Sequence, residues 1–144
     1  PDIYGEPWGG GISKGRLIVG NLTVLTHLIG TKHLPSFKKS ILIIEDIGEA
    51  PYRIDRMLTH LRLAGVLHQL SGLGFGSFTS CDDEKDVDKS KTFKLLDIFK
   101  DRTQDLKIPI VSSLPIGHCC GNASLPLGSQ AILNGDKGSL SLLK

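Results

Sequence analysis

Four consecutive aliphatic residues at positions 41–44 constrain the fold of this chain more than any other feature. A short run of Ile and Leu, bounded by the polar residues 38–40 and by Asp46, is typical of a parallel strand that is covered on both faces. The run ends at Glu45, which places a carboxylate where the strand is expected to meet a turn. Ligands of open α/β sheets bind outside the carboxyl ends of the strands, so Glu45 is a candidate site residue.

A second buried strand is expected over residues 108–111, and the loop that follows it leads to His118. Two strands of one parallel sheet end at the same edge, so a carboxylate and an imidazole at two such ends predict a shared site. The competing interpretation is that Glu45 is a solvated loop residue or a helix cap. The local pattern leaves both interpretations open.

The clearest helical pattern follows Glu45. Pro51 suits a first helical position, and Gly65 suits the residue after the last turn. Between them, one face of the helix carries the apolar residues Ile54, Met57, Leu58 and Leu61. The sequence therefore predicts a strand, a turn and a helix around the candidate carboxylate.

Strand and helix signals alternate along the rest of the chain. Residues 16–19 predict a strand, followed by a helix that Asn21 can cap. A glycine-rich strand is expected over residues 72–78, and a second amphipathic helix from Phe93 toward Leu106. This order favours an α/β fold with a mixed sheet.

The chain is expected to close with a β-hairpin. Two apolar runs, 131–133 and 140–142, flank the turn-forming residues 134–138. Residues 82–91 hold mostly charged side chains and predict a mobile surface loop, and the Gly- and Pro-rich start of the chain predicts a linker.

Composition bounds the possible functions. At 144 residues the chain suits one domain, and a net charge of +2 lacks the basic excess that indicates nucleic-acid binding. No apolar run approaches the roughly 18 residues that cross a bilayer, so no membrane partner is expected. The odd number of cysteines, 3, fits reduced thiols of a cytoplasmic protein better than a disulfide framework.

Cys119 and Cys120 stand directly after His118 and raise two alternatives, a metal site and a cysteine nucleophile. Zinc sites usually combine a Cys-x2-Cys pair with a second pair of ligands, and the sequence has no such arrangement. Adjacent residues seldom reach the geometry in which a histidine activates a thiol. We therefore predict packed loop thiols, with no metal and no cofactor.

Five pieces of the chain, in order, resemble the LD-carboxypeptidase family of serine peptidases, also called muramoyltetrapeptide carboxypeptidases. They are residues 15–22, residues 28–31, residues 44–49 with 51–58, the Gly117-His118 pair, and the Leu-Pro-Leu-Gly sequence at 125–128. The resemblance implies a three-layer, swivelling β/β/α-type domain. It also implies a Ser-His-Glu triad, to which this chain contributes Glu45 and His118 as catalytic residues.

In this family the nucleophilic serine lies in an N-terminal domain, on a Gly-x-Ser-Asp turn that does not occur in this sequence. We therefore expect residues 1–14 to be the remnant of an interdomain linker and residues 15–144 to be a C-terminal domain. Losing one triad member removes most of the activity, so this domain alone is expected to be inactive.

The resemblance also implies a substrate and partners. The substrate is a murein tetrapeptide in the cytoplasm, from which terminal D-Ala is released during cell-wall recycling, and the enzyme is expected to be a homodimer. A related branch, the microcin C immunity peptidases, cleaves aminoacyl-nucleotide analogues, and a non-catalytic binding domain of the same fold is a third possibility. The fragment does not separate these alternatives.

Three further residues near the site are candidates for substrate binding, namely Asn21, Asp46 and Glu49. Helix capping explains each of them as well. Family members commonly carry Gly where this chain has Val19, and if that loop lines the substrate cleft, the resemblance does not extend to the details of substrate specificity.

Overall fold

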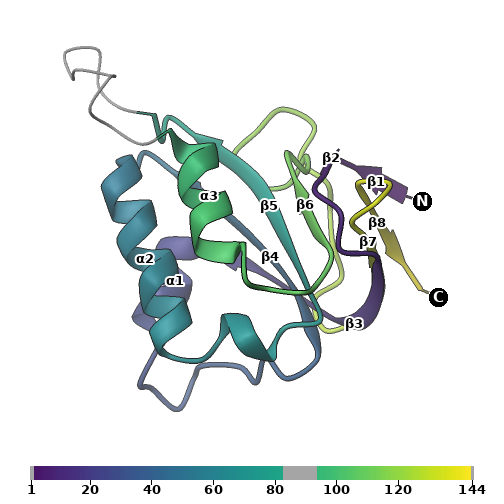
Figure 1. Cartoon of the computed structure of the whole chain (residues 1–144), viewed down its shortest axis with the longest axis horizontal. Helices are drawn as coiled ribbons and strands as arrows, with labels where there is room; N and C mark the ends of the chain where they lie inside the picture. The colour runs from purple at the N-terminus through teal and green to yellow at the C-terminus, as the bar shows by residue number, and fades with distance from the viewer. Residues whose placement is uncertain (1, 83–93, 144) are drawn as a thin grey trace.

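The computed structural model describes residues 2–82 and 94–143, which form one eight-stranded mixed sheet and three α-helices (Figure 1). The strands are β1 (Asp2–Tyr4), β2 (Glu6–Pro7), β3 (Ile12–Asn21), β4 (Ser40–Ile47), β5 (Gly72–Thr79), β6 (Ile110–Ser112), β7 (Gln130–Asn134) and β8 (Ser139–Leu142). The helices are α1 (Leu22–His27), α2 (Pro51–Leu63) and α3 (Leu95–Thr103), with a short 3-10 turn at Leu67–Gln69. The expected α/β class, mixed sheet and closing hairpin are confirmed. Apart from Asp82, the charged segment 82–91 and the expected helix start at Phe93 lie outside the described residues.

The centre of the sheet is parallel. Its strands follow the order β3, β4, β5, β6, with β4 hydrogen-bonded to β3 on one side and to β5 on the other. Residues 41–44 of β4 are fully buried, as the aliphatic run predicts. The prediction that the strand ends at Glu45 is wrong, because β4 continues to Ile47. The pairing of Asn21 with Glu45 and of Asp46 with Phe78 keeps the backbone in the sheet.

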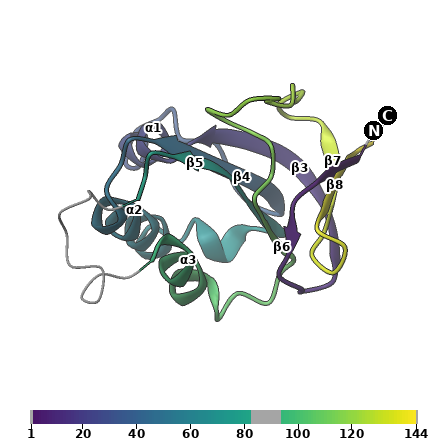
Figure 2. The same ribbon diagram turned by 90° about the horizontal axis from the view of Figure 1, so that it is seen from above.

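The sheet curls until its two ends are joined by the start of the chain (Figure 2). β1 pairs with β8 at one end of the sheet and β2 pairs with β6 at the other, with only Gly5 between β1 and β2. Gly5 donates to Gly138 O at 2.8 Å, and a Cβ at Gly5 would collide with the carbonyl of Ser112. Residues 2–4, 6–7 and 12–14 of the expected linker remnant are strand residues of this sheet, and the division into linker and domain stays a prediction.

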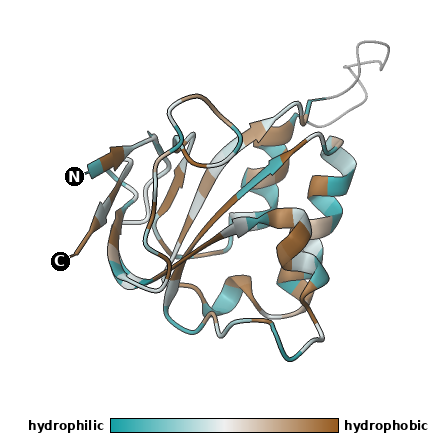
Figure 3. Ribbon diagram, turned by 180° about the vertical axis from the view of Figure 1, so that it is seen from behind, coloured by the Kyte–Doolittle hydropathy of each residue, from teal (hydrophilic) through white to brown (hydrophobic). Residues whose placement is uncertain are grey.

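Alternation along the strands divides the core into two clusters. Ile41 and Ile43 point into the curl of the sheet, where Leu17, Val111 and Leu133 meet them. The other face of β4 belongs to the cluster beneath the helices, which includes Leu42, Ile44, Ile54, Leu58, Leu61 and Phe75. Figure 3 shows the hydrophobic residues running along the central strands. Because both faces of β4 are covered, the position of every side chain on it is fixed by its place in the alternation.

α2 begins and ends as its sequence predicts. Pro51 occupies the first helical position, and Gly65 follows the helix with a φ of +74°. Val66 N donates to Leu61 O at 2.9 Å, a bond that satisfies one of the last carbonyls of the helix.

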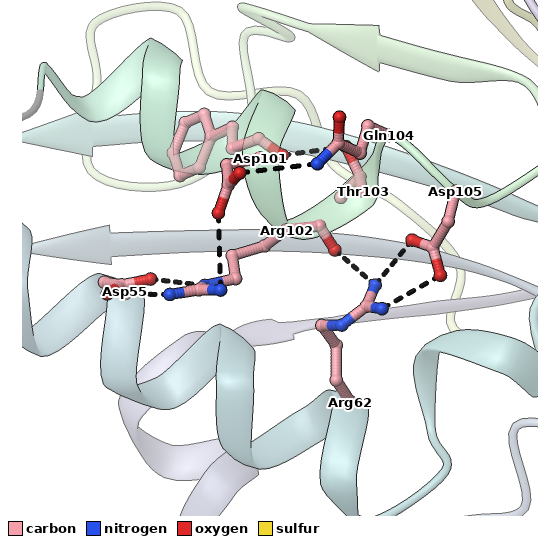
Figure 4. Close-up of polar contacts among 8 residues, drawn as sticks. Asp55, Arg62, Asp101, Arg102, Thr103, Gln104 and Asp105 are labelled. Atoms are coloured by element: carbon pink, nitrogen blue, oxygen red, sulfur yellow. Dashed lines mark hydrogen bonds and ion pairs between the residues drawn. The ribbon is translucent and has the colours of Figure 1, made fainter.

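Two arginines tie α2 to α3 (Figure 4). Arg102 of α3 contacts both carboxylate oxygens of Asp55 at 2.5 and 3.2 Å. Arg62 of α2 contacts both oxygens of Asp105 at 2.7 and 2.9 Å and donates to Arg102 O at 2.7 Å. The hydrogen bonds from Arg62 hold the pKa of Asp105 well below its ordinary value of 3.8. No helix of the described segments has the length and hydropathy needed to cross a bilayer.

We expect Asp105→Asn to lower the stability of the protein at neutral pH and to lose this effect in acid. The folded-state pKa of Asp105 is lowered, so its contribution is present above the ordinary value of 3.8 and is lost as the pH falls through the folded-state value. Urea unfolding of both proteins at pH 7, 5 and 3 measures the difference. In an Arg62→Gln background the Asp105→Asn change should have little effect at any pH. An equal difference at pH 7 and pH 3 would contradict the assignment.

Candidate active site

Glu45 and His118 are 73 residues apart in sequence and in contact in the structure, with Nδ1 of His118 2.7 Å from Oε2 of Glu45. Glu45 is 7% exposed, whereas the side chain of His118 is 52% exposed. An ionised carboxylate can only accept, so in a neutral imidazole Nδ1 carries the proton and Nε2 is left as an acceptor. The pair therefore combines a buried carboxylate with an accessible ring nitrogen.

The position of Glu45 follows from the alternation of β4. It lies on the same side of the strand as Ile41 and Ile43, inside the curl, and the register with β5 shifts between Ile44 and Asp46. Gly117 passes directly over the carboxylate with a φ of +112°, and a Cβ there would lie 2.6 Å from Oε2 of Glu45. Only glycine combines this backbone angle with this close approach.

The loop after β6 carries His118 along the edge of β5. Leu114 N donates to Phe75 O at 3.1 Å, and Ser77 N donates to Ile116 O at 2.8 Å. Beyond Ile116, Thr79 Oγ1 donates to His118 O at 2.5 Å, and Gly117 N donates to Asn122 Oδ1 at 3.0 Å. Thus β5 and the loop itself determine where the imidazole lies.

A cleft of about 440 Å³ opens beside the pair. Its lining consists of Glu45 and His118, the asparagines Asn21 and Asn122, and a mostly apolar wall of Val19, Gly20, Ile116, Gly117, Ala123, Leu125 and Leu127. Within the described part of the chain, no serine, threonine or cysteine lines this cleft. The described residues thus place an imidazole against a carboxylate in this cleft, and none of those that line it carries a hydroxyl or a thiol.

Asn21 lies in the cleft and also begins α1. Its Oδ1 accepts from Val24 N at 3.0 Å, so the predicted helix cap is confirmed. Its Nδ2 donates to Asp46 at 3.0 Å. A role in substrate binding stays a prediction for Asn21.

Asp46 and Glu49 do not line the cleft. Asp46 is 2% exposed on the helix side of β4 and accepts from Asn21, from the backbone and hydroxyl of Thr23 at 2.9 and 2.8 Å, and from Ile47 N at 2.8 Å. These contacts hold the first turn of α1 against the end of β4. Glu49 faces Thr23 and Arg53 at 3.5 Å. The geometry supports a structural role for Asp46 and gives no support to substrate binding by either carboxylate.

The cysteines also lie outside the cleft lining. All three are free, Cys81 is buried, and burial raises the pKa of its thiol. Among residues 2–82 and 94–143, no three His, Cys, Asp or Glu side chains come together in a way that could hold a metal ion.

The fold and the site define a class of protein, namely an α/β domain in which a buried carboxylate contacts a histidine beside a cleft. The chain belongs to the family described as the LD-carboxypeptidase C-terminal domain, whose model matches residues 14–133. The resemblance found in the five sequence pieces is confirmed.

Named relatives agree with this assignment. A Synechocystis sp. protein with a provisional carboxypeptidase name is 46% identical over 141 residues, which are 98% of this chain and 46% of that protein. The murein tetrapeptide carboxypeptidase of Pseudomonas aeruginosa is 38% identical over 127 residues, which are 86% of this chain and 39% of that protein. The crystal structure of muramoyltetrapeptide carboxypeptidase from Oxalobacter formigenes superposes with a TM-score of 0.85 at 32% identity and covers 99% of this chain and 49% of that one. The chain spans less than half the length of these relatives.

Three residues that shape the site carried no functional signal of their own in the sequence. Gly117 is part of the Gly-His pair, but its closeness to Glu45 appears only in the folded chain. Thr79 ends a strand and Asn122 lies in a loop, where many such residues are simply solvated.

We expect Gly117→Ala to cost about 1–3 kcal/mol more stability than Gly121→Ala, because only the first adds overpacking against Glu45. Both glycines have a positive φ, of +112° and +75°, but a Cβ at Gly121 meets nothing within 4 Å. Urea unfolding of the two variants measures the difference. Equal losses would show that Glu45 does not restrict this position.

We expect Asp46→Ala to lower the free energy of unfolding by about 1–3 kcal/mol, because part-buried donors of Asn21, Thr23 and Ile47 lose their acceptor. The matched control is Glu49→Ala, whose contacts are 3.5 Å long and partly exposed, with an expected change within about 0.5 kcal/mol. Thermal or urea unfolding compares the two. A negligible loss for Asp46→Ala would return Asp46 to the list of candidate substrate ligands.

Proposed function

We propose that this chain is the C-terminal half of a serine-type LD-carboxypeptidase that releases terminal D-Ala from murein tetrapeptides. The observation that carries the proposal is the 2.7 Å contact between Glu45 and His118 at a cleft, in a chain that belongs to the LD-carboxypeptidase family. Two relatives more than 30% identical to this chain have names that specify this substrate class.

Amide hydrolysis needs a nucleophile, a base that takes its proton, and a group that fixes the tautomer of the base. His118 suits the second role, because its Nδ1 proton is bound by Glu45 and its Nε2 is free to accept. In the proposed reaction Nε2 takes the proton of the attacking hydroxyl and later gives it to the leaving amine. Glu45 stabilises the imidazolium that exists between these two steps.

The proposed nucleophile is a serine from a part of the protein outside this chain. Two observations support this division. The described cleft lining offers no hydroxyl or thiol, and the relatives are more than twice as long as the segment that they share with this chain. We therefore expect the chain by itself to be inactive, and the expected homodimer and cytoplasmic location remain predictions.

Burial of the carboxylate strengthens the proposed arrangement. At 7% exposure, Glu45 is largely removed from water, so its attraction to a protonated His118 is screened less than it would be at the surface. The carboxylate is also carried by a central strand rather than by a loop, which keeps the direction of the hydrogen bond fixed.

A second substrate class has one observation in its favour. The microcin C7 self-immunity protein of Escherichia coli is 28% identical over 136 residues, which are 94% of this chain and 38% of that protein. The higher identity to the murein enzyme from Pseudomonas aeruginosa favours the murein substrate. Assays with a murein tetrapeptide and with an aminoacyl-sulfamoyl adenosine, on the protein that contains the remaining part, choose between the two classes, and inactivity on both would favour a non-catalytic binding domain.

We expect Glu45→Gln to lower kcat of that longer protein about 10⁴-fold, because an amide nitrogen can donate to Nδ1 and so favour the wrong tautomer. His118→Ala removes the base and should lower kcat at least as much. D-Ala release from the tetrapeptide measures both. Asp101→Asn, an exposed change on α3, is the matched control and should retain full turnover. Turnover within tenfold of the unmodified protein for either site variant would overturn the assignment of roles.

A further inference from the structure

We propose that Thr79 and Asn122 are positioning residues that hold the imidazole of His118 on Glu45. Neither side chain needs to touch the reacting atoms for this purpose. Each binds the backbone at or next to His118, Thr79 at His118 O and Asn122 at Gly117 N.

The backbone needs such a hold because its own anchoring stops short of the histidine. Up to Ile116 the loop is bonded to β5 through backbone groups, the last bond being Ser77 N to Ile116 O at 2.8 Å. In the described chain, the hydrogen bonds that tie the backbone of residues 117–118 to anything beyond their immediate neighbours come from Thr79 and Asn122. Gly117 has more backbone freedom than any other residue type, so this point of the loop would otherwise move most easily.

Thr79 links the backbone of His118 to the strand that carries Glu45. It is the last residue of β5 and is paired with Ile47 of β4, and its carbonyl accepts from Gly48 N at 2.9 Å. Its hydroxyl then reaches His118 O at 2.5 Å. Thr79 is therefore hydrogen-bonded both to Gly48, directly after β4, and to His118, which itself contacts Glu45 of β4. Both members of the Glu45–His118 pair are thus positioned relative to the same strand.

Asn122 closes the tip of the loop from the other side. Its Oδ1 accepts from Gly117 N at 3.0 Å, and Ala123 N donates to Pro115 O at 2.9 Å. The segment between Gly117 and Asn122 contains the partly exposed Cys119 and the exposed Cys120, which contribute little packing at the tip of the loop. The asparagine bond thus fixes the peptide that immediately precedes His118.

Loss of either bond should disturb the geometry of the Glu45 contact more than the stability of the fold. A shift of about 1 Å in a catalytic group costs on the order of 10²-fold in rate. The kinetic consequence rests on the function proposed above, whereas the position of the imidazole does not. The two can therefore be tested separately.

The test of position uses this chain, labelled with ¹⁵N at histidine, and records the ring nitrogen shifts of His118 by NMR at neutral pH. These shifts report which ring nitrogen carries the proton. In its neutral form the imidazole of the unmodified chain should show protonated Nδ1 and unprotonated Nε2. Thr79→Val and Asn122→Ala should each move the shifts toward the averaged values of a freely exchanging imidazole.

Conservative and matched variants separate positioning from a general structural effect. Thr79→Ser keeps the hydroxyl and Asn122→Asp keeps an acceptor, so both should retain the shifts of the unmodified chain. Thr31→Val removes a hydrogen bond of the same kind, from a hydroxyl to the carbonyl of Leu28 at 2.7 Å. Thr31 lies in the turn after α1, outside β4 and β5, so this variant should leave the shifts of His118 unchanged. Circular dichroism identifies a variant that fails to fold, and the other variant then carries the test.

In the longer protein, Thr79→Val and Asn122→Ala should lower kcat about 10- to 100-fold while KM changes less than threefold, and Thr79→Ser should restore most of the loss. The positioning proposal would be overturned if the ¹⁵N shifts of His118 were the same in both variants as in the unmodified chain. It would also be overturned if Thr31→Val changed these shifts as much as the two variants do. Altered shifts together with normal turnover in Glu45→Gln would instead overturn the proposed function and leave the positioning intact.

Discussion

The parallel pairing of β4 with β3 and β5 is the constraint on which the rest of the structure depends. It buries residues 41–44 completely and gives the sheet two faces, one beneath the helices and one inside the curl. Strand alternation then determines on which face of the sheet each of the two following carboxylates lies. Glu45 points into the curl, toward the cleft and His118, whereas Asp46 points to the helix side and binds the start of α1.

The two residues of the site are held in different ways, Glu45 by a central strand and His118 by hydrogen bonds to its loop. Glu45 belongs to a central strand with a buried core on each face, so little can move it. His118 belongs to a loop, and a hydroxyl, an amide and a glycine bring that loop against the carboxylate. In the proposed function, this division keeps the orientation of the base fixed while its outer nitrogen stays accessible to the proposed nucleophile.

Much of the fold could be predicted because its signals are local. The aliphatic run at 41–44, the helix from Pro51 to Leu63 and the hairpin around residues 134–138 depend on hydrophobic periodicity and turn chemistry within a few residues. The closure of the sheet could not be predicted in this way. The first strands are short, and each is stabilised by a partner that lies more than 100 residues further along the chain, so their composition indicates only a linker.

By itself the sequence determined the class of fold, the family and the candidate pair Glu45 and His118. Buried strands, helix ends and family motifs can be recognised because each depends on residues that are close together in sequence. Only the tertiary structure decided that the imidazole and the carboxylate meet at 2.7 Å, that Asn21 lies in the cleft, and that Asp46 and Glu49 do not. The physical reason is that a contact between distant segments depends on strand register and on the path of a loop. Both are set by the packing of the whole sheet rather than by any short stretch of the chain.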